Sequence, residues 1–240
     1  MKHIYTFIFS LLLLAAPVLR AQEKTTDTVA APPKTDRYGL RIGADLHRIA
    51  RSVYDDGYRG FEVVADFRLT KKIYIAGEIG NEENTVDDTQ LNFTTKGSYL
   101  KIGIDYNAYE NWLDMENMIY AGVRYGVSNF SHTLNSYRIY DPSGYFNQAP
   151  FVAGRDYDGL TAHWAEVLGG VKAEIFDNLY LGFSVRLHLL LANNKPNNFD
   201  NLYIPGFNRT YGGSFGAGFN YTVSYFIPIY KKAKSRKEKK

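Results

Sequence analysis

From Tyr38 onward, hydrophobic and polar residues alternate along the chain with a period of two. The stretch 211–225 is the clearest example: its odd positions hold mainly tyrosine, phenylalanine, alanine and valine, and its even positions are small or polar. This alternation predicts a β-strand with one apolar face. The run is much longer than an ordinary strand of about 5–6 residues, so it indicates a strand of unusual length.

Seven other segments repeat the pattern, with their apolar positions in 38–46, 61–69, 73–79, 100–106, 119–127, 165–175 and 181–191. Most of these segments approach the roughly 9–11 residues that a tilted strand needs to cross a bilayer. We therefore predict an all-β fold, an eight-stranded antiparallel up-and-down transmembrane β-barrel. The even number of strands returns the end of the chain to the side on which it began.

The predicted connections alternate in length. Residues 70–72 and 177–178 form tight turns and 107–117 a moderate one, whereas 48–58, 82–96, 129–159 and 192–210 are mostly longer. If the exported N-terminus lies in the periplasm, every long connection falls on the external side. Short periplasmic turns with long external loops are typical of outer-membrane barrels.

The face opposite the apolar one carries charges of both signs in nearly equal number. An eight-stranded barrel is just wide enough to be filled by its own side chains, so we expect these charges to pair across the lumen and leave no open pore. The predicted lumen network consists of Arg41, Asp45, Glu62, Asp66, Arg68, Glu78, Lys101, Asp105, Arg124, Glu166, Lys172, Glu174, Arg186 and His188. Two alternatives are a narrow ion path through these groups and a soluble lipocalin-like carrier, whose apolar face would line the interior.

Aromatic residues lie near both ends of the apolar face. A transmembrane barrel has two such girdles where it meets the lipid headgroups. The predicted girdles are Tyr38, Phe67, Tyr106 and Tyr225 at the periplasmic ends and Phe61, Tyr211 and Phe215 at the external ends.

The N-terminal residues indicate export to the outer membrane. Residues 1–21 have a basic start, an apolar stretch and small residues at the end, as in a secretory signal peptide. Residues 22–37 contain Pro32-Pro33 and no periodicity, which predicts a flexible leader before the barrel at 38–230. The basic segment 231–240 is predicted to be a periplasmic tail, which either binds anionic headgroups or is simply solvated.

Composition and charge exclude several other classes of protein. The chain has no cysteine, which rules out disulfides, thiolate metal sites and a thiol nucleophile. The mean hydropathy of −0.31 excludes a bundle of transmembrane helices, and 45% hydrophobic residues exclude wholesale disorder. The net charge of +3 is due to the tail, since residues 22–230 have a net charge of −5; we therefore expect no nucleic-acid partner.

The two longest connections, 129–159 and 192–210, are rich in aromatic and asparagine residues. Such loops on a rigid scaffold suit binding, and they equally suit a cap packed over the barrel mouth. The candidates for binding an extracellular or envelope protein or glycan are Tyr137, Tyr140, Tyr145, Phe151, Tyr157, Phe199, Tyr203 and Phe207. Outer-membrane lipid is the other expected partner.

Several strings of the sequence carry a family resemblance: YGLRIGADL (38–46), FRLTKKIYIAGEIGNEE (67–83), LNFTTKGSYLKIGIDYNAYENWLDMENMIYAGVRYG (91–126) and FSHTLNSYRIY (130–140). They resemble an uncharacterised family of barrel proteins from Bacteroidetes-type bacteria, a domain of unknown function. The overall plan is similar to small OmpA/OmpX-type barrels. The resemblance implies the fold and the location, and it implies no catalytic residues.

Residues with the chemistry of a lipid-modifying enzyme are few. Ser131, His132 and His163 lie near the outer rim, with Asp156 and Asp158 nearby. A serine nucleophile needs a histidine within hydrogen-bond reach and a third group that orients it, and neighbours in sequence do not supply that geometry. We predict no enzyme, no cofactor and no metal; the acidic residues of 82–88 could hold calcium but match no known loop. The leading hypothesis is a structural or binding barrel that acts through its external loops.

Overall fold

The computed structural model describes residues 35–88, 90–109, 116–138, 151–196, 200–209 and 213–233. The predicted signal peptide, most of the predicted leader and most of the tail lie outside these residues. The strands are β1 (Thr35–Asp45), β2 (Tyr58–Arg68), β3 (Ile73–Asp87), β4 (Leu91–Asn107), β5 (Met118–Tyr137), β6 (Phe151–Phe176), β7 (Leu179–Asn193) and β8 (Phe215–Ala233). The chain also forms one described helix, α2 (Leu46–Tyr54).

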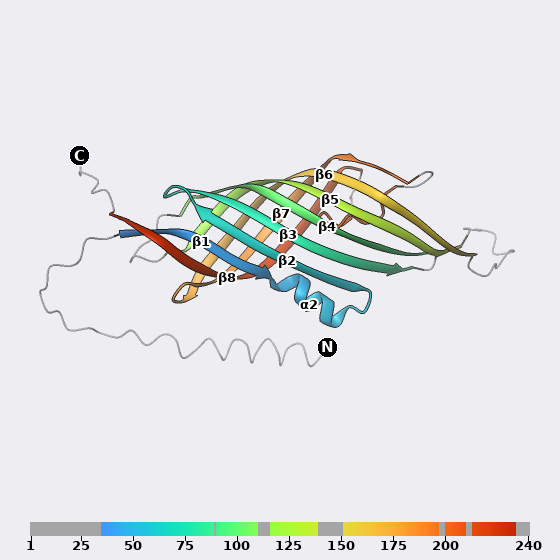
Figure 1. Ribbon diagram of the computed structural model, residues 1–240, viewed down its shortest axis with the longest axis horizontal. Coiled ribbons are helices and arrows are strands. Elements are labelled where there is room, and N and C mark those ends of the chain that lie inside the picture. Colours follow the sequence, from blue (N-terminus) through green and yellow to red (C-terminus); the bar gives the residue numbers. More distant parts are fainter. Residues whose placement is uncertain are drawn as a thin grey trace, which may run out of the picture. The chain divides into compact units, whose positions relative to one another are not determined.

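The eight strands form a closed barrel in which each strand pairs antiparallel with its neighbours in sequence (Figure 1). Pairing of β1 with β8, from Thr35 opposite Ala233 to Asp45 opposite Thr222, closes the ring. The predicted all-β, eight-stranded, up-and-down fold is confirmed. The first and last strands each extend three residues beyond the predicted barrel, into the segments assigned to the leader and the tail.

The barrel has a charged interior and an apolar exterior. Lys101 is 1% exposed, whereas its neighbour Ile102 is 59% exposed and Leu187 on β7 is 63% exposed. This is the reverse of a soluble barrel, in which apolar side chains face inward. The arrangement contradicts the lipocalin-like alternative, because a hydrophobic ligand would have to lie among buried charges.

The apolar outer face forms a band that is shorter than several of the strands. On β3, β4 and β5 the band ends at Ile79, Leu100 and Val127, and the outward positions beyond it are polar, such as Asn129 and Thr133. The prediction of loops at 82–96 and over much of 129–159 was therefore wrong. These residues continue β3, β4, β5 and β6, but both of their faces are largely polar, so the sequence lacks the alternation that revealed the other strands.

Helix α2 replaces much of the predicted loop at 48–58. The Asp45 carboxylate accepts a hydrogen bond of 2.8 Å from the backbone N–H of His47, which caps the first turn. The apolar residues Leu46, Ile49 and Val53 lie on one side of the helix and are exposed, whereas Arg48 is buried. Among the described residues, no helix is long and apolar enough to cross a membrane.

Most predicted girdle residues that the structure describes lie on the outer face. Phe61, Tyr106, Phe215 and Tyr225 are exposed there and Phe67 is half-buried; Tyr211 lies outside the described residues. Tyr38 was assigned wrongly, since it is only 4% exposed. An irregularity between Tyr38 and Gly39 shifts the register and turns the side chain inward, where its ring stacks on Tyr230 with centroids 5.1 Å apart.

Candidate functional site

The centre of the lumen is a cluster of paired charges. The Lys101 ammonium lies 3.3 Å from Glu166, 3.4 Å from Glu78 and 3.6 Å from Glu62. Arg186 pairs with Glu78 at 2.6 Å and with Glu166 at 3.2 Å. All five side chains are buried. Two cations thus hold three carboxylates together, which satisfies charges that would otherwise be costly to bury.

A second group of charges continues this cluster toward the end of the barrel that carries the chain termini. Arg124 pairs with Asp105 at 2.7 Å, and Lys172 pairs with Asp66 at 2.6 Å. Arg41 lies 3.7 Å from Asp66. The cavity that remains among these side chains has a volume of about 20 Å³, which holds about one water molecule. The lumen is therefore filled by its own side chains at this level.

The predicted lumen residues all lie on the inner side of the wall, but they do not form one network. Arg68 and Glu174 lie near the end of the barrel that carries the chain termini, where they contact partners that the prediction did not include. Glu174 pairs with Arg37 at 3.1 Å, and Arg68 lies 3.5 Å from Glu116. Residues 35–37 had been assigned to the leader, which is why Arg37 was missed.

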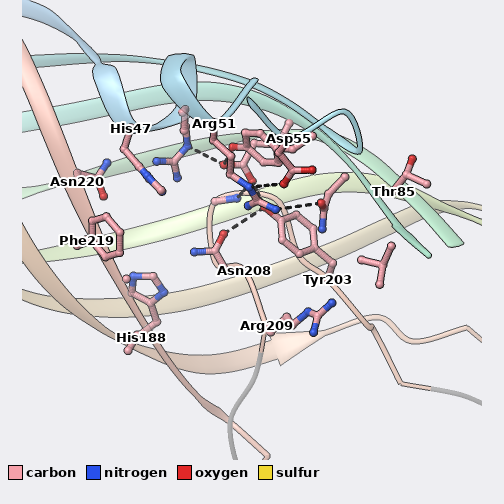
Figure 2. A pocket seen from close by; sticks show the side chains of 18 of the residues that line it. His47, Arg51, Asp55, Thr85, His188, Tyr203, Asn208, Arg209, Phe219 and Asn220 are labelled. Carbon is pink, nitrogen blue, oxygen red and sulfur yellow. Dashed lines mark hydrogen bonds and ion pairs between the residues drawn. The ribbon is translucent and has the colours of Figure 1, made fainter. Parts of the chain in front are cut away.

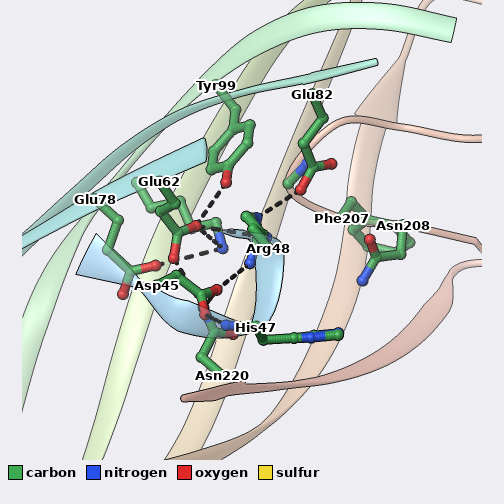
Figure 3. A network of polar contacts seen from close by, with 12 residues as sticks. Asp45, His47, Arg48, Glu62, Glu78, Glu82, Tyr99, Phe207, Asn208 and Asn220 are labelled. Atoms are coloured by element: carbon green, nitrogen blue, oxygen red, sulfur yellow. Dashed lines mark hydrogen bonds and ion pairs between the residues drawn. The ribbon is translucent and has the colours of Figure 1, made fainter. Parts of the chain in front are cut away.

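At the opposite end, Arg48 of α2 reaches into the barrel and joins three carboxylates (Figure 3). It lies 2.5 Å from Asp45, 2.6 Å from Glu82 and 3.5 Å from Glu62. Neither Arg48 nor Glu82 was predicted to belong to the network. A polar face at helical spacing within 46–54 was the signal in the sequence for Arg48, whereas the prediction assigned both Arg48 and Glu82 to loops.

Glu82 is the point at which several segments meet. It accepts hydrogen bonds from the hydroxyls of Tyr58 (3.0 Å) and Tyr203 (2.8 Å) and from the backbone N–H of Gly206 (3.0 Å). The residue lies beyond the apolar band. Burial alone would raise the pKa of its carboxyl, but Arg48 and these donors hold that pKa below its usual range. A charged Glu82 therefore ties the segment 200–209 to α2 and β3.

The segment 200–209 packs into the mouth as an apolar cap. Phe207, Ile204 and Tyr203 are buried, and the Phe207 ring meets Trp164 edge-on with centroids 5.9 Å apart. Two of the binding candidates, Tyr203 and Phe207, are therefore not exposed, because both rings pack into the barrel mouth. Of the two interpretations of the connection 192–210, the described part of it fits the packed cap.

The other aromatic candidates lie on the parts of β5 and β6 that extend beyond the apolar band, at the end of the barrel opposite the chain termini. Tyr137 and Phe151 are exposed and stack on each other across the two strands, with centroids 5.6 Å apart. Tyr157 is half-buried, with the Arg155 guanidinium 5.6 Å from its ring. Tyr140, Tyr145 and Phe199 lie outside the described residues.

The residues considered for catalysis do not come together. His132 is buried on the inner side of β5, with Nδ1 2.6 Å from the hydroxyl of Thr95, and Ser131 precedes it on the other side of the strand. His163 is on the outer face, 3.0 Å from the hydroxyl of Tyr125. Glu82 and Glu83, considered for calcium, likewise lie on opposite sides of β3. Neither hypothesis is supported by this geometry.

His132 gives the mouth of the barrel beside the segment 200–209 a predicted pH dependence. Burial lowers the pKa of His132 to about 4, compared with about 6.5 in an unfolded chain. Between these two pH values the unfolded form binds more protons than the folded form. The contribution of His132 to the free energy of unfolding is therefore fully present above about pH 6.5 and is lost as the pH falls toward 4. Asn201 of the cap lies beside the ring, so we expect the protection of the 200–209 amides, measured relative to their intrinsic exchange rates, to be lower at pH 5 than at pH 7.

The control is His132→Gln, which retains a polar partner for Thr95 but does not titrate. Comparing the two proteins at the same pH removes the intrinsic pH dependence of hydrogen exchange. An equal loss of protection in both proteins at pH 5 would show that another group is responsible.

A pocket of about 450 Å³ lies at the mouth, bounded by α2, the end of β3, the cap and residues 217–220 of β8 (Figure 2). His47 of α2 packs against Phe219 of β8 with ring centroids 4.6 Å apart. Arg51 is held over the Tyr58 ring at 3.9 Å and pairs with Asp55 at 3.0 Å. The pocket combines paired charges, amides and aromatic rings.

Comparison with known proteins gives one family and two solved structures. The model of a family described as "Domain of unknown function (DUF6048)" matches residues 2–232. The first is Ail, the attachment invasion locus protein of Yersinia pestis, which is 10% identical in sequence. Its alignment covers 79% of this chain and 97% of the Ail chain, with a TM-score of 0.40. The second is CarO2 of Acinetobacter baumannii, which is 12% identical in sequence. Its alignment covers 80% of this chain and 99% of the CarO2 chain, with a TM-score of 0.34. No curated protein matches the sequence.

Proposed function

We propose that this chain, which belongs to the DUF6048 family of unknown function, is an integral outer-membrane β-barrel that binds a partner at its external end. The observation that carries the proposal is the reversal of the two faces. The outer face bears a continuous apolar band, with Val167, Leu187 and Ile102 more than half exposed, and the charges lie inside. In lipid, a closed barrel satisfies every backbone group of its strands.

The filled lumen supports a binding role over conduction. Lys101, Arg186 and Arg124 and the carboxylates around them occupy the centre of the barrel, and the cavity of about 20 Å³ among the lumen side chains gives a hydrated ion little space. The external end, in contrast, has strand extensions with exposed aromatic residues and a pocket of about 450 Å³. Binding at this end is therefore the role that we propose, in place of transport or catalysis.

Heat-modifiability tests the membrane part of this proposal. A folded transmembrane barrel in the outer-membrane fraction should migrate differently in boiled and unboiled gel samples. The substitution Ile102→Lys, in the middle of the apolar band, should reduce the folded fraction, because a lysine at the bilayer midplane costs about 2–4 kcal/mol. The matched substitution Asn129→Lys, on the outer face beyond the band, should have little effect.

The opposite result is as informative. If the protein is found in the soluble fraction and tolerates Ile102→Lys as well as Asn129→Lys, the apolar band does not lie in lipid and the proposal fails. The bacterial group from which the chain comes stays a prediction.

A further inference from the structure

Helix α2 exposes only apolar and aromatic side chains. Its exposed residues are Leu46, Ile49, Ala50, Val53 and Tyr54, and of these Val53 is 82% exposed and Tyr54 is 73% exposed. A surface helix in water normally carries charged and polar residues on its outer side. α2 therefore shows the same reversal of faces as the strands of the barrel.

The polar residues of α2 are held on the side that faces the barrel. Arg48 is buried among its carboxylate partners. The Ser52 hydroxyl accepts a hydrogen bond of 2.8 Å from the backbone N–H of Gly60 on β2, and Arg51 is half-buried over the Tyr58 ring. These contacts fix the rotation of the helix about its axis, so its apolar side stays on the outside.

The apolar side of α2 continues the apolar band of the strands. The helix follows β1 directly, and the last outward-facing residue of β1, Ala44, is opposite Val63 of β2. Val63 is in turn opposite Ile79, where the band ends on β3. His47 of the helix packs against the outward-facing ring of Phe219 on β8. α2 therefore lies at the edge of the band and in contact with it (Figure 1).

α2 also stands where the wall of the barrel lacks a strand. β1 ends at Asp45, opposite Thr222 of β8, whereas β8 stays paired with β7 as far as Phe215. Among the described strands, residues 215–221 of β8 therefore have a partner on one side only, and α2 contacts both β2 and β8. An open sheet edge does not occur in the hydrocarbon region of a bilayer. The edge and the helix therefore fit the level of the headgroups, where backbone groups can reach water.

We propose that α2 is an interfacial helix that inserts its apolar side into the membrane leaflet at the external end of the barrel. Leu46, Ile49 and Val53 contact the acyl chains, and Tyr54 lies among the headgroups, as aromatic residues do at a membrane boundary. Lipid is favoured over a protein partner because this surface is continuous with the band that the barrel presents to the bilayer. The inference rests on the proposed function, because α2 meets lipid only if the barrel spans the membrane.

Single-cysteine variants test this contact, since the chain contains no cysteine. The full chain carries the fluorophore NBD at Val53→Cys and is reconstituted in phosphatidylcholine vesicles that include phosphatidylcholine with a doxyl spin label on its acyl chain. Two controls are labelled in the same way. Leu187→Cys lies in the apolar band, where the side chain is 63% exposed, and Lys96→Cys lies on the outer face of β4 beyond the band.

An interfacial helix buries its apolar side about 5–10 Å into the boundary between headgroups and acyl chains. We therefore expect a doxyl group near the headgroup to quench the label at Val53 more strongly than a doxyl group near the end of the acyl chain. Iodide in the aqueous phase should quench the label at Val53 at least about threefold less than the label at Lys96, because the first lies below the headgroups and the second lies in water.

Two results would overturn the inference. Equal quenching by iodide at Val53 and Lys96 would mean that water covers the apolar side of the helix. Protection of the Val53 label from both iodide and the spin-labelled lipid would mean that a protein, such as a second copy of the chain, covers it.

A second measurement needs no label. Ile49→Ser combined with Val53→Ser removes apolar surface but leaves the intrinsic helix propensity almost unchanged, since the three residue types have similar propensities. In vesicles, we expect the amides of α2 to exchange at least about tenfold faster than in wild type, after correction for intrinsic exchange rates. Unchanged protection in the folded double variant would contradict the inference, because the contacts of Arg48 and Ser52 with the barrel would then suffice to hold the helix.

Heat-modifiability of each sample separates the two proposals. A wild-type barrel that is folded in the membrane and leaves the Val53 label open to iodide contradicts this inference alone. A chain that neither enters the membrane nor shifts on heating contradicts the proposed function as well.

Discussion

Replacement of Arg48 by methionine is expected to lower the free energy of unfolding by about 3–5 kcal/mol, the cost of removing one partner from a buried ion pair. The Arg48 guanidinium lies within 3.5 Å of Asp45, Glu62 and Glu82, and the three carboxylates are buried. Without the guanidinium, this end of the barrel loses the cation that links them. The cap should loosen first, because Glu82 holds Tyr203 and Gly206.

Urea unfolding of the full chain in detergent micelles measures this loss, and limited proteolysis at 200–209 measures release of the cap. Arg51→Met is the matched control on the same helix. Arg51 pairs only with the partly exposed Asp55 among the described carboxylates, so its loss should cost no more than about 1 kcal/mol. Equal effects of the two substitutions would mean that Arg48 does not depend on its buried partners.

A double substitution tests whether the effect is electrostatic. Arg48→Met combined with Glu82→Gln removes one unpaired carboxylate and should regain part of the lost stability. The amide can still accept hydrogen bonds from Tyr203 and Gly206. A double variant that is less stable than Arg48→Met would indicate that packing of the methylene stem, and not the charge, accounts for the loss.

The two faces of the barrel could be predicted well from the sequence. Successive side chains of a strand point to opposite faces, so the alternation of apolar and polar residues assigns each residue to a face. Ile102 and Lys101 are neighbours in the sequence, and their opposite chemistry already assigns them to opposite faces. The same reasoning failed at Tyr38, where the register irregularity before Gly39 reverses the alternation. A one-residue irregularity of this kind depends on the partner strand and leaves no mark in the local pattern.

The mouth of the barrel was harder to predict. The spacing of Leu46, Ile49 and Val53 is helical, so α2 could have been predicted from the sequence even though 48–58 was interpreted as a loop. The pairing of Arg48 with Glu82 could not be predicted from the sequence, because it depends on where α2 lies against the end of β3. The burial of Phe207 likewise depends on the space beside Trp164, which exists only once the barrel has closed.

The second large effect is expected at the centre of the lumen. Lys101→Met removes an ammonium that lies within 3.6 Å of Glu62, Glu78 and Glu166, at a position only 1% exposed. Arg186 still pairs with Glu78 and Glu166, but three carboxylates then share fewer cations. We expect a loss of about 3–5 kcal/mol, measured as a lower urea midpoint at unchanged slope.

The pattern of rescue distinguishes a structural plug from a path for ions. If the lumen charges serve only to fill the barrel, Lys101→Met combined with Glu166→Gln should recover part of the stability, since well-packed replacements of a buried pair are often tolerated. A planar-bilayer recording should then be silent for wild type and for both variants. If wild type conducts in discrete steps and Lys101→Met alters the conductance at nearly unchanged stability, the charges line a path, and the binding role proposed for the external end loses its main support.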